Sequence, residues 1–436
     1  MHILLIGNGA REHAIAEAIK RSNTDVFLYT VGPKKNPGIE KLSEEYLLAD
    51  VLDTEKIVAF AKEKNIEIVI PGAEAPLAAG IVDALQSVGI FSFGPTKSLA
   101  RLETSKSFTR NILEKYGIEG NPQQKSFKTI DGLREYMEEM RDMAVKSDGL
   151  CGGKGVKLTG EHLHSIDEAY DFAVSCIEKD GGVVIEEKLE GEEFSYISLT
   201  DGKTVLHTFP IQDHKRAFEG DIGPNTGGMG TYNDEHLSLP FLEEKDLLEA
   251  GHITEQVFSA LEKETGEKYV GVMYGGFMKT KNGIKLIEYN ARFGDPEAMN
   301  ILSLLLSDFI EFLLACKNKA LDSYHLEFIK KASVVKYIVP ESYPEKKASF
   351  TEVTIESVDT NTMLYYADCE EKDGKIRLGS SRGIAIVGFG DTLREAEIQA
   401  ENGVAHIHGN VRHRKDIGTK EAIEKRIQHM NNILNS

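Results

Sequence analysis

The sequence contains no tryptophan and only four cysteines among its 436 residues. The cysteines are far apart in the chain, with no CxxC pair and no histidine at the spacing of metal ligands; they are Cys151, Cys176, Cys316 and Cys369. This spacing argues against both a disulfide framework and a structural zinc site. We therefore expect a protein of a reducing compartment, the cytoplasm.

The sequence also lacks a long uninterrupted hydrophobic run of the kind that crosses a membrane. The apolar stretch 301–316 is interrupted by Asp308 and Glu311, so we expect it to form one packed helix. The first residues, MHILLIG, have neither a basic head nor a small-residue cleavage site, and they indicate a first strand instead of a signal peptide.

Positive charges are outnumbered, with 51 lysines and arginines against 70 aspartates and glutamates. The formal net charge of −19 argues against general binding of nucleic acids or of anionic membrane surfaces. A protein with this charge that binds phosphates needs local clusters of lysine, arginine, backbone amides or metal ions. We expect its partners to be small molecules only, and the chain to be a monomer.

The length predicts about three domains, because one hydrophobic core does not extend over so many residues. Residues 1–101 alternate between apolar strand patterns, at 3–6, 26–30 and 66–70, and helical patterns, one of them capped by Asp53 or Thr54. Strands that alternate with helices predict an open, parallel α/β sheet.

The rest of the chain shows three further segments. Residues 102–190 have an α+β pattern with a glycine-rich loop, DGLCGGKG, and residues 191–322 contain a second such loop, GPNTGGMG. Residues 323–436 contain four strand patterns followed by a helix that begins near Thr392, which predicts a small β-rich C-terminal domain. The fold class is thus a multidomain mixture of α/β and α+β.

The first candidate site is GNGAREHA, residues 7–14, directly after the first strand. A glycine turn before a helix presents backbone N–H groups to a phosphate, and Arg11 and His13 beside it favour a phosphate or ribose ligand. Glu12 replaces the third glycine of the dinucleotide motif, and no acidic residue lies near position 30, so a nicotinamide site is disfavoured. A tight turn that binds nothing is an equally good interpretation of this motif alone.

The loop DGLCGGKGV, residues 148–156, is the second candidate. Glycines let a backbone fold closely over a polyphosphate, and Lys146 and Lys154 could neutralise it. The Walker pattern is absent, and a plain flexible turn remains an alternative. Cys151 is interpreted as a small filler residue, because no general base stands near it in the sequence.

The strongest signal is KLIEYNARFGDPE, residues 285–297. In a strand Glu288, Asn290 and Arg292 would share one face, with Ile287, Tyr289 and Ala291 on the other. A carboxylate and an amide oxygen suit Mg²⁺, and the neighbouring arginine can bind an anion. A solvent-facing polar strand is the alternative, which the adjacent Gly-Asp-Pro turn makes less attractive.

The last cluster is DHKR, residues 213–216, followed by GPNTGGMG at 223–230. Each segment alone is typical of a solvated loop. Together they supply an acid, two cations, an amide, a hydroxyl and several free N–H groups. This combination suits a phosphosugar and an amino acid.

With these motifs the chain resembles the phosphoribosylamine–glycine ligases of the ATP-grasp superfamily from end to end. Further segments that carry the resemblance are GAEAPLAAGIVDAL, FGPTKSLARLETSK, EEKLEGEE and a terminal HRKDIG at 413–418. The resemblance implies an N-terminal α/β domain (1–101), an ATP-grasp subdomain with a glycine-rich lid (102–190), a second one with the metal and substrate site (191–322), and a C-terminal domain (323–436).

The resemblance also implies roles for individual residues. The ATP-binding residues would be Lys106 and Lys146 at the phosphates, Glu186, Glu187 and Leu189 at the adenine, Glu193 at the ribose, and Gly149, Gly152, Gly153, Lys154 and Gly155 in the lid. Glu288 and Asn290 would hold Mg²⁺, or Mn²⁺ in its place. Glycine and phosphoribosylamine would be surrounded by Gly9, Arg11, Asp213, Lys215, Asn225, Thr226, Gly227, Arg292 and Asp295. Of these, Arg292, Lys146, Asp213 and Lys215 would be catalytic.

The implied reaction has two steps. The glycine carboxylate attacks the γ-phosphate of ATP, and the amine of phosphoribosylamine then displaces phosphate from glycyl phosphate. No serine or cysteine nucleophile is needed, because the protein positions reactants and neutralises charge. Two alternatives stay open, another ATP-grasp ligase or biotin-type carboxylase and a non-catalytic ATP sensor.

Three positions depart from the family pattern: Ala73 replaces a proline, Cys151 a more usual alanine, and Gly276 a side-chain metal ligand of some relatives. The first two are interpreted as packing changes. The third leaves the coordination of a second Mg²⁺ open.

Overall fold

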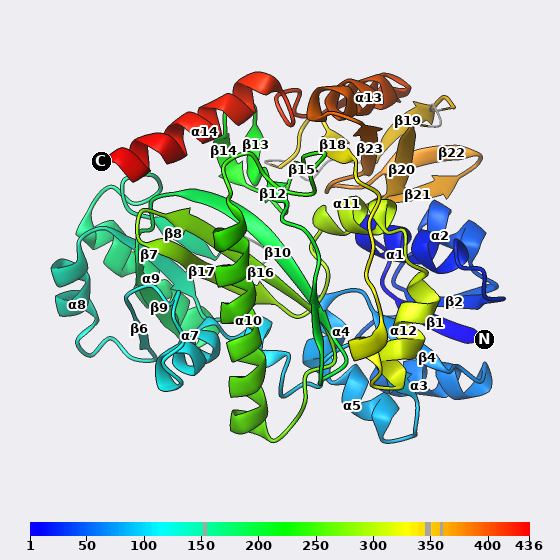
Figure 1. Ribbon diagram of the computed structural model, residues 1–436, viewed down its shortest axis with the longest axis horizontal. Helices are drawn as coiled ribbons and strands as arrows, with labels where there is room; N and C mark the ends of the chain where they lie inside the picture. Colours follow the sequence, from blue (N-terminus) through cyan, green and yellow to red (C-terminus); the bar gives the residue numbers. More distant parts are fainter. Residues whose placement is uncertain (151–154, 345–349, 358–360) are drawn as a thin grey trace.

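The computed structural model describes residues 1–150, 155–344, 350–357 and 361–436. Its N-terminal, middle and C-terminal parts lie around a common centre (Figure 1). The N-terminal segment, in blue, forms a parallel sheet on one side, and the cyan and green segments form two antiparallel sheets on the other. The orange and red C-terminal segments lie above both.

The N-terminal part is a five-stranded parallel sheet of order β3-β2-β1-β4-β5. Its elements are β1 (His2–Ile6), α1 (Ala10–Lys20), β2 (Phe27–Gly32), α2 (Pro37–Leu42), β3 (Glu45–Leu48), α3 (Thr54–Glu63), β4 (Ile68–Pro71), α4 (Glu74–Ala79), α5 (Ile81–Gln86) and β5 (Phe91–Ser92). Ile3 and Leu5 of β1 pack into one core with residues of α1, and Leu4 and Ile6 into another with residues of α3 and α5. Both faces of the sheet are thus covered, as parallel sheets require.

The predicted open α/β sheet is confirmed in this part of the chain. The three predicted strands agree with β1, β2 and β4 to within two residues, and Asp53 caps α3 by accepting a hydrogen bond from the backbone N–H of Lys56. The edge strand β3 was not predicted, because its four residues are only partly buried or exposed and show no apolar alternation.

Two antiparallel sheets follow, of orders β6-β9-β7-β8 and β11-β10-β16-β17. The first contains β6 (Gln124–Phe127), β7 (Met143–Ser147), β8 (Val156–Leu158) and β9 (Val183–Glu187), with helices α6 (Arg101–Thr104), α7 (Lys106–Lys115), α8 (Leu133–Met140) and α9 (Ile166–Asp180). The second contains β10 (Glu192–Thr200), β11 (Val205–His207), β16 (Gly271–Thr280) and β17 (Gly283–Asn290), and α10 (Glu244–Thr265) packs on it.

The apolar stretch 301–316 does not form one helix, so that prediction was wrong. It is divided between α11 (Glu297–Leu304) and α12 (Phe309–Lys317). Asp308 caps α12, since its carboxylate accepts hydrogen bonds from the N–H groups of Ile310 and Glu311 at 2.8 and 3.2 Å. The aspartate that interrupts the apolar run therefore starts a new helix there.

The C-terminal strands form two more sheets. A six-stranded sheet joins β12 (Gln212–Asp213), β15 (Gly230–Asn233), β18 (Ala332–Pro340), β20 (Thr362–Tyr366), β23 (Ile384–Gly390) and β25 (Val411–Arg412); the other has β19 (Thr351–Ile355), β21 (Cys369–Lys372), β22 (Lys375–Leu378) and β24 (Ile407–Gly409). Because β12 and β15 precede residue 322, the first sheet joins the middle of the chain to its end.

Two helices complete this part. The helix predicted to begin near Thr392 is α13 (Leu393–Ala405), which Thr392 caps and which packs on β23 and β18. The last helix, α14 (Lys420–Asn435), leaves the C-terminal sheets and contacts β10 and β16 instead (Figure 1). The last helix of the chain therefore packs on the second antiparallel sheet.

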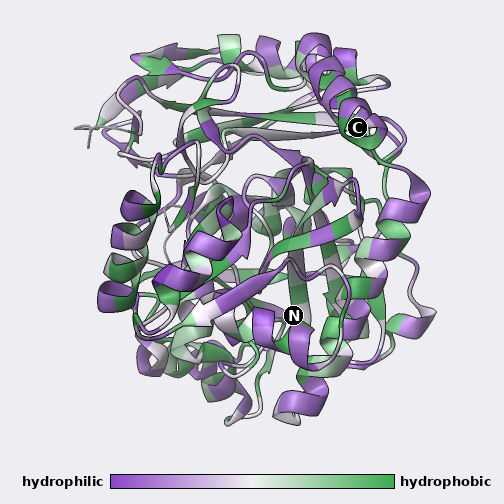
Figure 2. Cartoon of the chain, turned by 90° about the vertical axis from the view of Figure 1, so that its left-hand side faces the viewer, coloured by the Kyte–Doolittle hydropathy of each residue, from purple (hydrophilic) through white to green (hydrophobic). Residues whose placement is uncertain are grey.

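Figure 2 shows most helices banded in purple and green, as expected when one face packs on a sheet and the other meets water. In the described parts of the chain, no helix is both long and apolar enough to cross a membrane.

Candidate functional site

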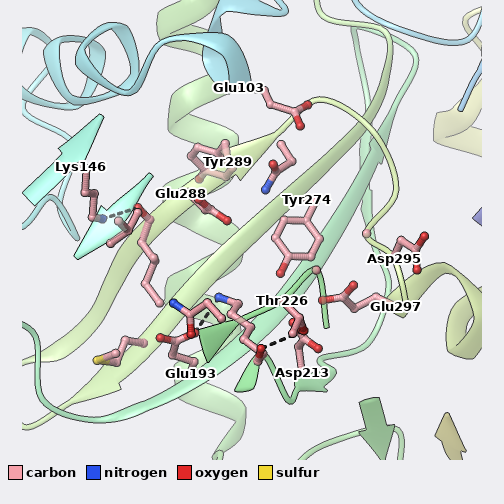
Figure 3. A pocket seen from close by; sticks show the side chains of 18 of the residues that line it. Glu103, Lys146, Glu193, Asp213, Thr226, Tyr274, Glu288, Tyr289, Asp295 and Glu297 are labelled. Carbon is pink, nitrogen blue, oxygen red and sulfur yellow. Dashed lines mark hydrogen bonds and ion pairs between the residues drawn. The ribbon is translucent and has the colours of Figure 1, made fainter. Parts of the chain in front are cut away.

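A cavity of about 1150 Å³ opens where these parts meet, and Figure 3 shows residues that line it. Side chains reach it from the N-terminal part, from both antiparallel sheets and from the C-terminal part. Pockets for one small molecule usually measure about 300–1,000 Å³. The size therefore leaves room for more than one ligand.

A buried triad of charges lies at one end of the cavity. Arg110 of α7 binds the Glu186 carboxylate with two hydrogen bonds of 2.7 and 2.8 Å, and the Lys146 ammonium lies 2.7 Å from the same carboxylate. Burial alone would raise the pKa of Glu186, but Arg110 and Lys146 lower it, while burial lowers the pKa of Lys146. The triad holds the lysine ammonium at the cavity wall.

Arg110 also joins this end to β17, because it donates hydrogen bonds to the carbonyls of Leu286 and Ile287 at 3.0 and 2.8 Å. Sequence reasoning missed Arg110, since a lone arginine in an amphipathic helix carries no local signal. Apolar residues line the cavity nearby, and they are Ala144, Val156, Leu158, Leu189 and Met278. This end thus combines an apolar wall with fixed positive charge.

The start of the predicted lid is tied to the beginning of α7. Lys106 donates a hydrogen bond to the carbonyl of Gly149 at 3.0 Å, and Asp148 accepts bonds from the hydroxyl of Ser105 and the N–H of Ser107, each at 3.1 Å. Lys106 and Gly149 line the cavity.

The centre of the predicted lid, Cys151, Gly152, Gly153 and Lys154, lies outside the described residues. Gly155, just beyond it, is buried, and its carbonyl accepts a hydrogen bond from the N–H of Ser147 at 2.8 Å. Gly155 is not among the residues that line the cavity.

The strand β17 brings Glu288 and Asn290 to the cavity, but its alternation is not regular. Glu288 pairs with Gly276 and Leu286 with Phe277, so Ile287 is an extra residue that forms a bulge. The prediction that Ile287 shares the face of Tyr289 was therefore wrong: Leu286 and Tyr289 pack into the core, whereas Ile287 is only partly buried, although both Ile287 and Tyr289 border the cavity.

The ionisation and the partners of Glu288 bear on whether this position suits a metal ion. Burial would raise its pKa, but Lys215, Lys106, Lys146 and Arg292 lower it, so the carboxylate is ionised. It forms no hydrogen bond or ion pair with the described part of the chain. Within the same residues, no cluster of three or more His, Cys, Asp and Glu side chains could hold a metal. Glu288 and Asn290 fit a Mg²⁺ whose other ligands come from phosphates and water.

Arg292 lies beyond the end of β17 and not within it. Its Nη2 atom is 2.9 Å from a carboxylate oxygen of Glu103 and donates a hydrogen bond to the amide oxygen of Asn290 at 3.1 Å. Glu74 is farther away, at 3.6 Å from Nε, and that buried Nε has no hydrogen-bond partner among the described residues. The guanidinium is therefore oriented from one side and keeps a donor for another ligand.

Three charged residues of the DHKR segment, Asp213, Lys215 and Arg216, line the other end of the cavity, and Figure 3 labels Asp213 there. Burial is the main cause that raises the pKa of Asp213 well above its usual range, and the negative charge of Glu297 is the second. The Oδ1 atom of Asp213 lacks a hydrogen-bond partner among the described residues. Burial would lower the pKa of Lys215, but Glu193, 2.8 Å away, and other anions raise it. This end thus presents a ready proton acceptor beside a fixed cation.

Glu297 and Tyr274 belong to this end too, and sequence reasoning missed both. The Ser195 hydroxyl donates to Glu297 at 2.7 Å and lies 2.8 Å from the Tyr274 hydroxyl. Glu297 ends the FGDPE motif, so its place in that motif was a usable signal. Tyr274 is opposite Asn290 on β16, a position that only strand pairing reveals.

The turn 7–14 meets the cavity less than predicted. Arg11 lines it and donates to the carbonyl of Phe293 at 3.2 Å. Gly9 does not line the cavity. The Glu12 side chain lies against the turn: it accepts a hydrogen bond from the N–H of Gly9 at 2.6 Å, and it packs so closely on Gly72 that a Cβ there would lie 2.4 Å away. The Glu12 side chain therefore fills the space that a bound phosphate would need at this turn.

His13 does not face a phosphate or ribose site. It is buried, and its Nδ1 atom accepts a hydrogen bond from the N–H of Tyr366 at 2.9 Å. Burial lowers the pKa of His13 to about 3, so the ring is neutral. The residue joins the N-terminal and C-terminal parts.

The C-terminal part contributes arginines that no motif had indicated. Arg382 donates to the carbonyls of Gly227 and Asp295 at 2.7 and 3.0 Å, and lies 3.2 Å from the Asp295 carboxylate. Arg426 of α14 also lines the cavity. The cavity is also lined by Asn225, Thr226, Gly227, Asp295, Glu187 and Glu193.

Three family models match successive parts of the chain. They are the N domain (1–103), the ATP-grasp (A) domain (104–298) and the C domain (333–420) of phosphoribosylglycinamide synthetase. Curated relatives named phosphoribosylamine–glycine ligase include that of Methanococcoides burtonii, 47% identical over 99% of this chain and 100% of the relative. That of Methanocaldococcus jannaschii is 45% identical over the same shares.

The solved structures agree. Phosphoribosylamine–glycine ligase from Thermotoga maritima superposes with a TM-score of 0.79 at 26% identity, over 95% of this chain and 100% of that one. A biotin carboxylase from Campylobacter jejuni reaches a TM-score of 0.76 at 14% identity, over 99% of this chain and 98% of that one, which shows a shared fold alone.

Proposed function

The chain belongs to the phosphoribosylglycinamide synthetase family, and we propose that it joins glycine to 5-phosphoribosylamine at the expense of ATP, in purine biosynthesis. The products would be glycinamide ribonucleotide, ADP and phosphate. One observation carries this proposal: Lys106, Lys146, Glu288, Asn290 and Arg292 line a single cavity.

The nucleotide would occupy the end of the cavity with the buried triad. Lys106 and Lys146 would contact its phosphates, Glu186, Glu187 and Leu189 the adenine, and Glu193 the ribose. Mg²⁺, or Mn²⁺, held by Glu288 and Asn290, would supply positive charge to the phosphates. The segment from Gly149 to Gly155 would cover them and exclude water from a reactive acyl phosphate.

In the first step the glycine carboxylate attacks the γ-phosphorus of ATP, and the bond to the ADP oxygen breaks. Arg292 would bind that carboxylate, which its partnerless Nε and its fixed orientation both favour. The residues position the reactants and neutralise charge, so no protein nucleophile is required.

In the second step the amine of phosphoribosylamine attacks the carbonyl carbon of glycyl phosphate, and inorganic phosphate leaves. The amine must lose a proton as the amide forms. Asp213 would accept it, because its raised pKa makes it a stronger base than an exposed carboxylate. Lys215, Asn225, Thr226, Gly227 and Asp295, with Arg11, would surround the two substrates. Gly9, which does not line the cavity, would contribute only through the turn that leads to Arg11.

We propose four functional domains, residues 1–101, 102–190, 191–322 and 323–436. We also propose that the protein is a monomer and is located in the cytoplasm. Cys316 and Cys369 form no disulfide within the described residues, which agrees with a reducing compartment. Cys316 and Cys369 are buried, and burial raises the pKa of both thiols, that of Cys369 to about 12.

The decisive experiment measures ADP release while glycine and phosphoribosylamine are omitted in turn, with the amine generated in situ from ribose 5-phosphate and ammonia. ADP should accumulate only when glycine is present, and glycinamide ribonucleotide only when both are. Activity with bicarbonate or D-alanine in place of glycine would indicate another ATP-grasp enzyme. ATP binding without glycine-dependent ADP release would indicate a sensor.

A further inference from the structure

The hairpin of β13 (Arg216–Phe218) and β14 (Ile222–Asn225) borders the substrate end of the cavity. It is flanked by Lys215 and Thr226, whose backbone N–H donates to the Lys215 carbonyl at 2.7 Å. A two-stranded ribbon of this size has no core of its own. Something else must hold it against the cavity.

The terminal HRKDIG motif provides that support. Arg414 is only 1% exposed, and it donates hydrogen bonds to the carbonyl of Arg216 and to the carboxylate of Asp221, both at 3.0 Å. Asp416 binds the Arg414 guanidinium at 2.6 Å and accepts a hydrogen bond from the N–H of Gly220 at 2.9 Å. A motif far along the chain thus holds the first strand of the hairpin and its turn.

Asp221 is the centre of this arrangement. Its φ of 60° lies in the left-handed region, which few residues other than glycine, asparagine and aspartate adopt. Its carboxylate binds Arg414 and Arg426 and lies 3.6 Å from His214. Burial would raise the pKa of Asp221, but His214, Arg426 and Arg414 lower it below its usual range.

Arg426 extends the contact to the nucleotide side. Its second amino group donates to Glu192 at 3.2 Å, and His429, also on α14, lies 2.6 Å from that carboxylate. Glu192 is buried and precedes the proposed ribose contact, Glu193. The helix that carries Arg426 begins where the matched C domain ends, at residue 420.

We propose that Asp221 is a positioning residue for the ligation: held by Arg414 and Arg426, it fixes the hairpin so that Lys215 and Asn225 face the substrates. The C-terminal helix thereby acts on a site built elsewhere in the chain. This inference rests on the function proposed above. It concerns mainly the substrate end, because neither Lys106 nor Lys146 forms a hydrogen bond or ion pair with the hairpin or the HRKDIG motif within the described residues. The hairpin meets the proposed ribose contact through Lys215, which binds Glu193 at 2.8 Å.

The test is Asp221→Asn in the full chain, because asparagine also tolerates the left-handed conformation while removing the charge. Loss of a charged hydrogen bond at this place should raise the KM for glycine and phosphoribosylamine about tenfold. The KM for ATP should stay within about twofold, a split that a general loss of folding would not produce.

The matched control is Asp373→Asn. Asp373 also has a positive φ, of 53°, but it is exposed in the turn between β21 and β22. Its kinetic constants should equal those of the wild type. Arg426→Met should raise the KM for ATP as well, since Arg426 also binds Glu192, and Arg426→Lys should recover part of the loss.

Three outcomes decide the matter. A raised KM for the two acceptor substrates alone supports the positioning role. Unchanged constants overturn it, and so does a parallel loss of ATP-induced thermal stabilisation and of all kinetic constants, which would mark Asp221 as merely structural. If the wild type itself releases no ADP with glycine, the proposed function fails instead, so the two failures are distinguishable.

Discussion

The role of Arg292 can be tested through the two carboxylates beside it. Glu103 is buried, lies 2.9 Å from the guanidinium, and also accepts a hydrogen bond from the N–H of Ala291 at 2.7 Å. Glu74 is 3.6 Å away and its side chain is 37% exposed. Glu103→Gln and Glu74→Gln therefore each remove one negative charge beside Arg292, the first from a close contact and the second from a weaker one.

The size of each effect follows from that geometry. A hydrogen bond to a charged group contributes about 1.5–3 kcal/mol, and each 1.4 kcal/mol is about tenfold in rate. Glutamine at position 103 can still accept from Ala291, so the loss is confined to Arg292. We expect kcat/KM for glycine to fall about 10- to 100-fold. The exposed, longer contact of Glu74 is worth about 0–1 kcal/mol, hence less than about fivefold.

The assay is glycine-dependent ADP release at saturating ATP, with kcat/KM for ATP measured alongside. The KM for ATP should change little in either variant, because the nucleotide contacts lie elsewhere. Equal losses for Glu103→Gln and Glu74→Gln would refute the reasoning, as would a Glu103→Gln enzyme with wild-type kinetics toward glycine.

Three further predictions concern the frame around the site. Arg110→Met should lower the unfolding free energy by about 3–5 kcal/mol, because it leaves the buried Glu186 carboxylate with a single cationic partner. Denaturant unfolding would measure it, and adding Glu186→Gln should restore part of the loss. Gly275→Ala should cost about 1–3 kcal/mol, since its Cβ would lie 2.3 Å from the ring of the phenylalanine two residues on. Gly276→Ala, whose nearest contact would be 3.5 Å, should keep the wild-type Tm in thermal scans. His13, with its pKa lowered to about 3 against 6.5 in the unfolded chain, should remain neutral in the native state while the unfolded state takes up a proton. Its contribution to stability is thus fully present above pH 6.5 and decreases as the pH falls toward 3. An NMR titration of the ring that shows a pKa near 6 would contradict this.

Local patterns in the sequence were sufficient for much of the fold. The apolar alternation of the first hundred residues predicted a parallel sheet, Asp53 or Thr54 was expected to cap a helix, and another helix was expected to begin near Thr392. The strand that carries Glu288 and Asn290 was also evident. Each of these features depends on neighbours within a few residues, so a short window of sequence contains the whole signal.

Other local features were not predicted from the sequence because they depend on tertiary contacts. Asp308 begins a new helix inside an apolar run, and it also accepts a hydrogen bond from Ser22 at 2.7 Å, a residue 286 positions away. The bulge at Ile287 exists only in the pairing of β17 with β16. A period read along one strand cannot reveal the register that the opposite strand imposes.

By itself, then, the sequence determined the family, the alternating strands and helices of the N-terminal sheet and the chemical types of most of the site residues. Only the tertiary structure decided which charges meet: Arg110 with Glu186, Arg292 with Glu103, and Arg414 with Asp221, which are 76, 189 and 193 residues apart. The physical reason is that such pairs form between side chains whose proximity arises from the packing of whole sheets and helices. No spacing in the linear chain encodes that proximity.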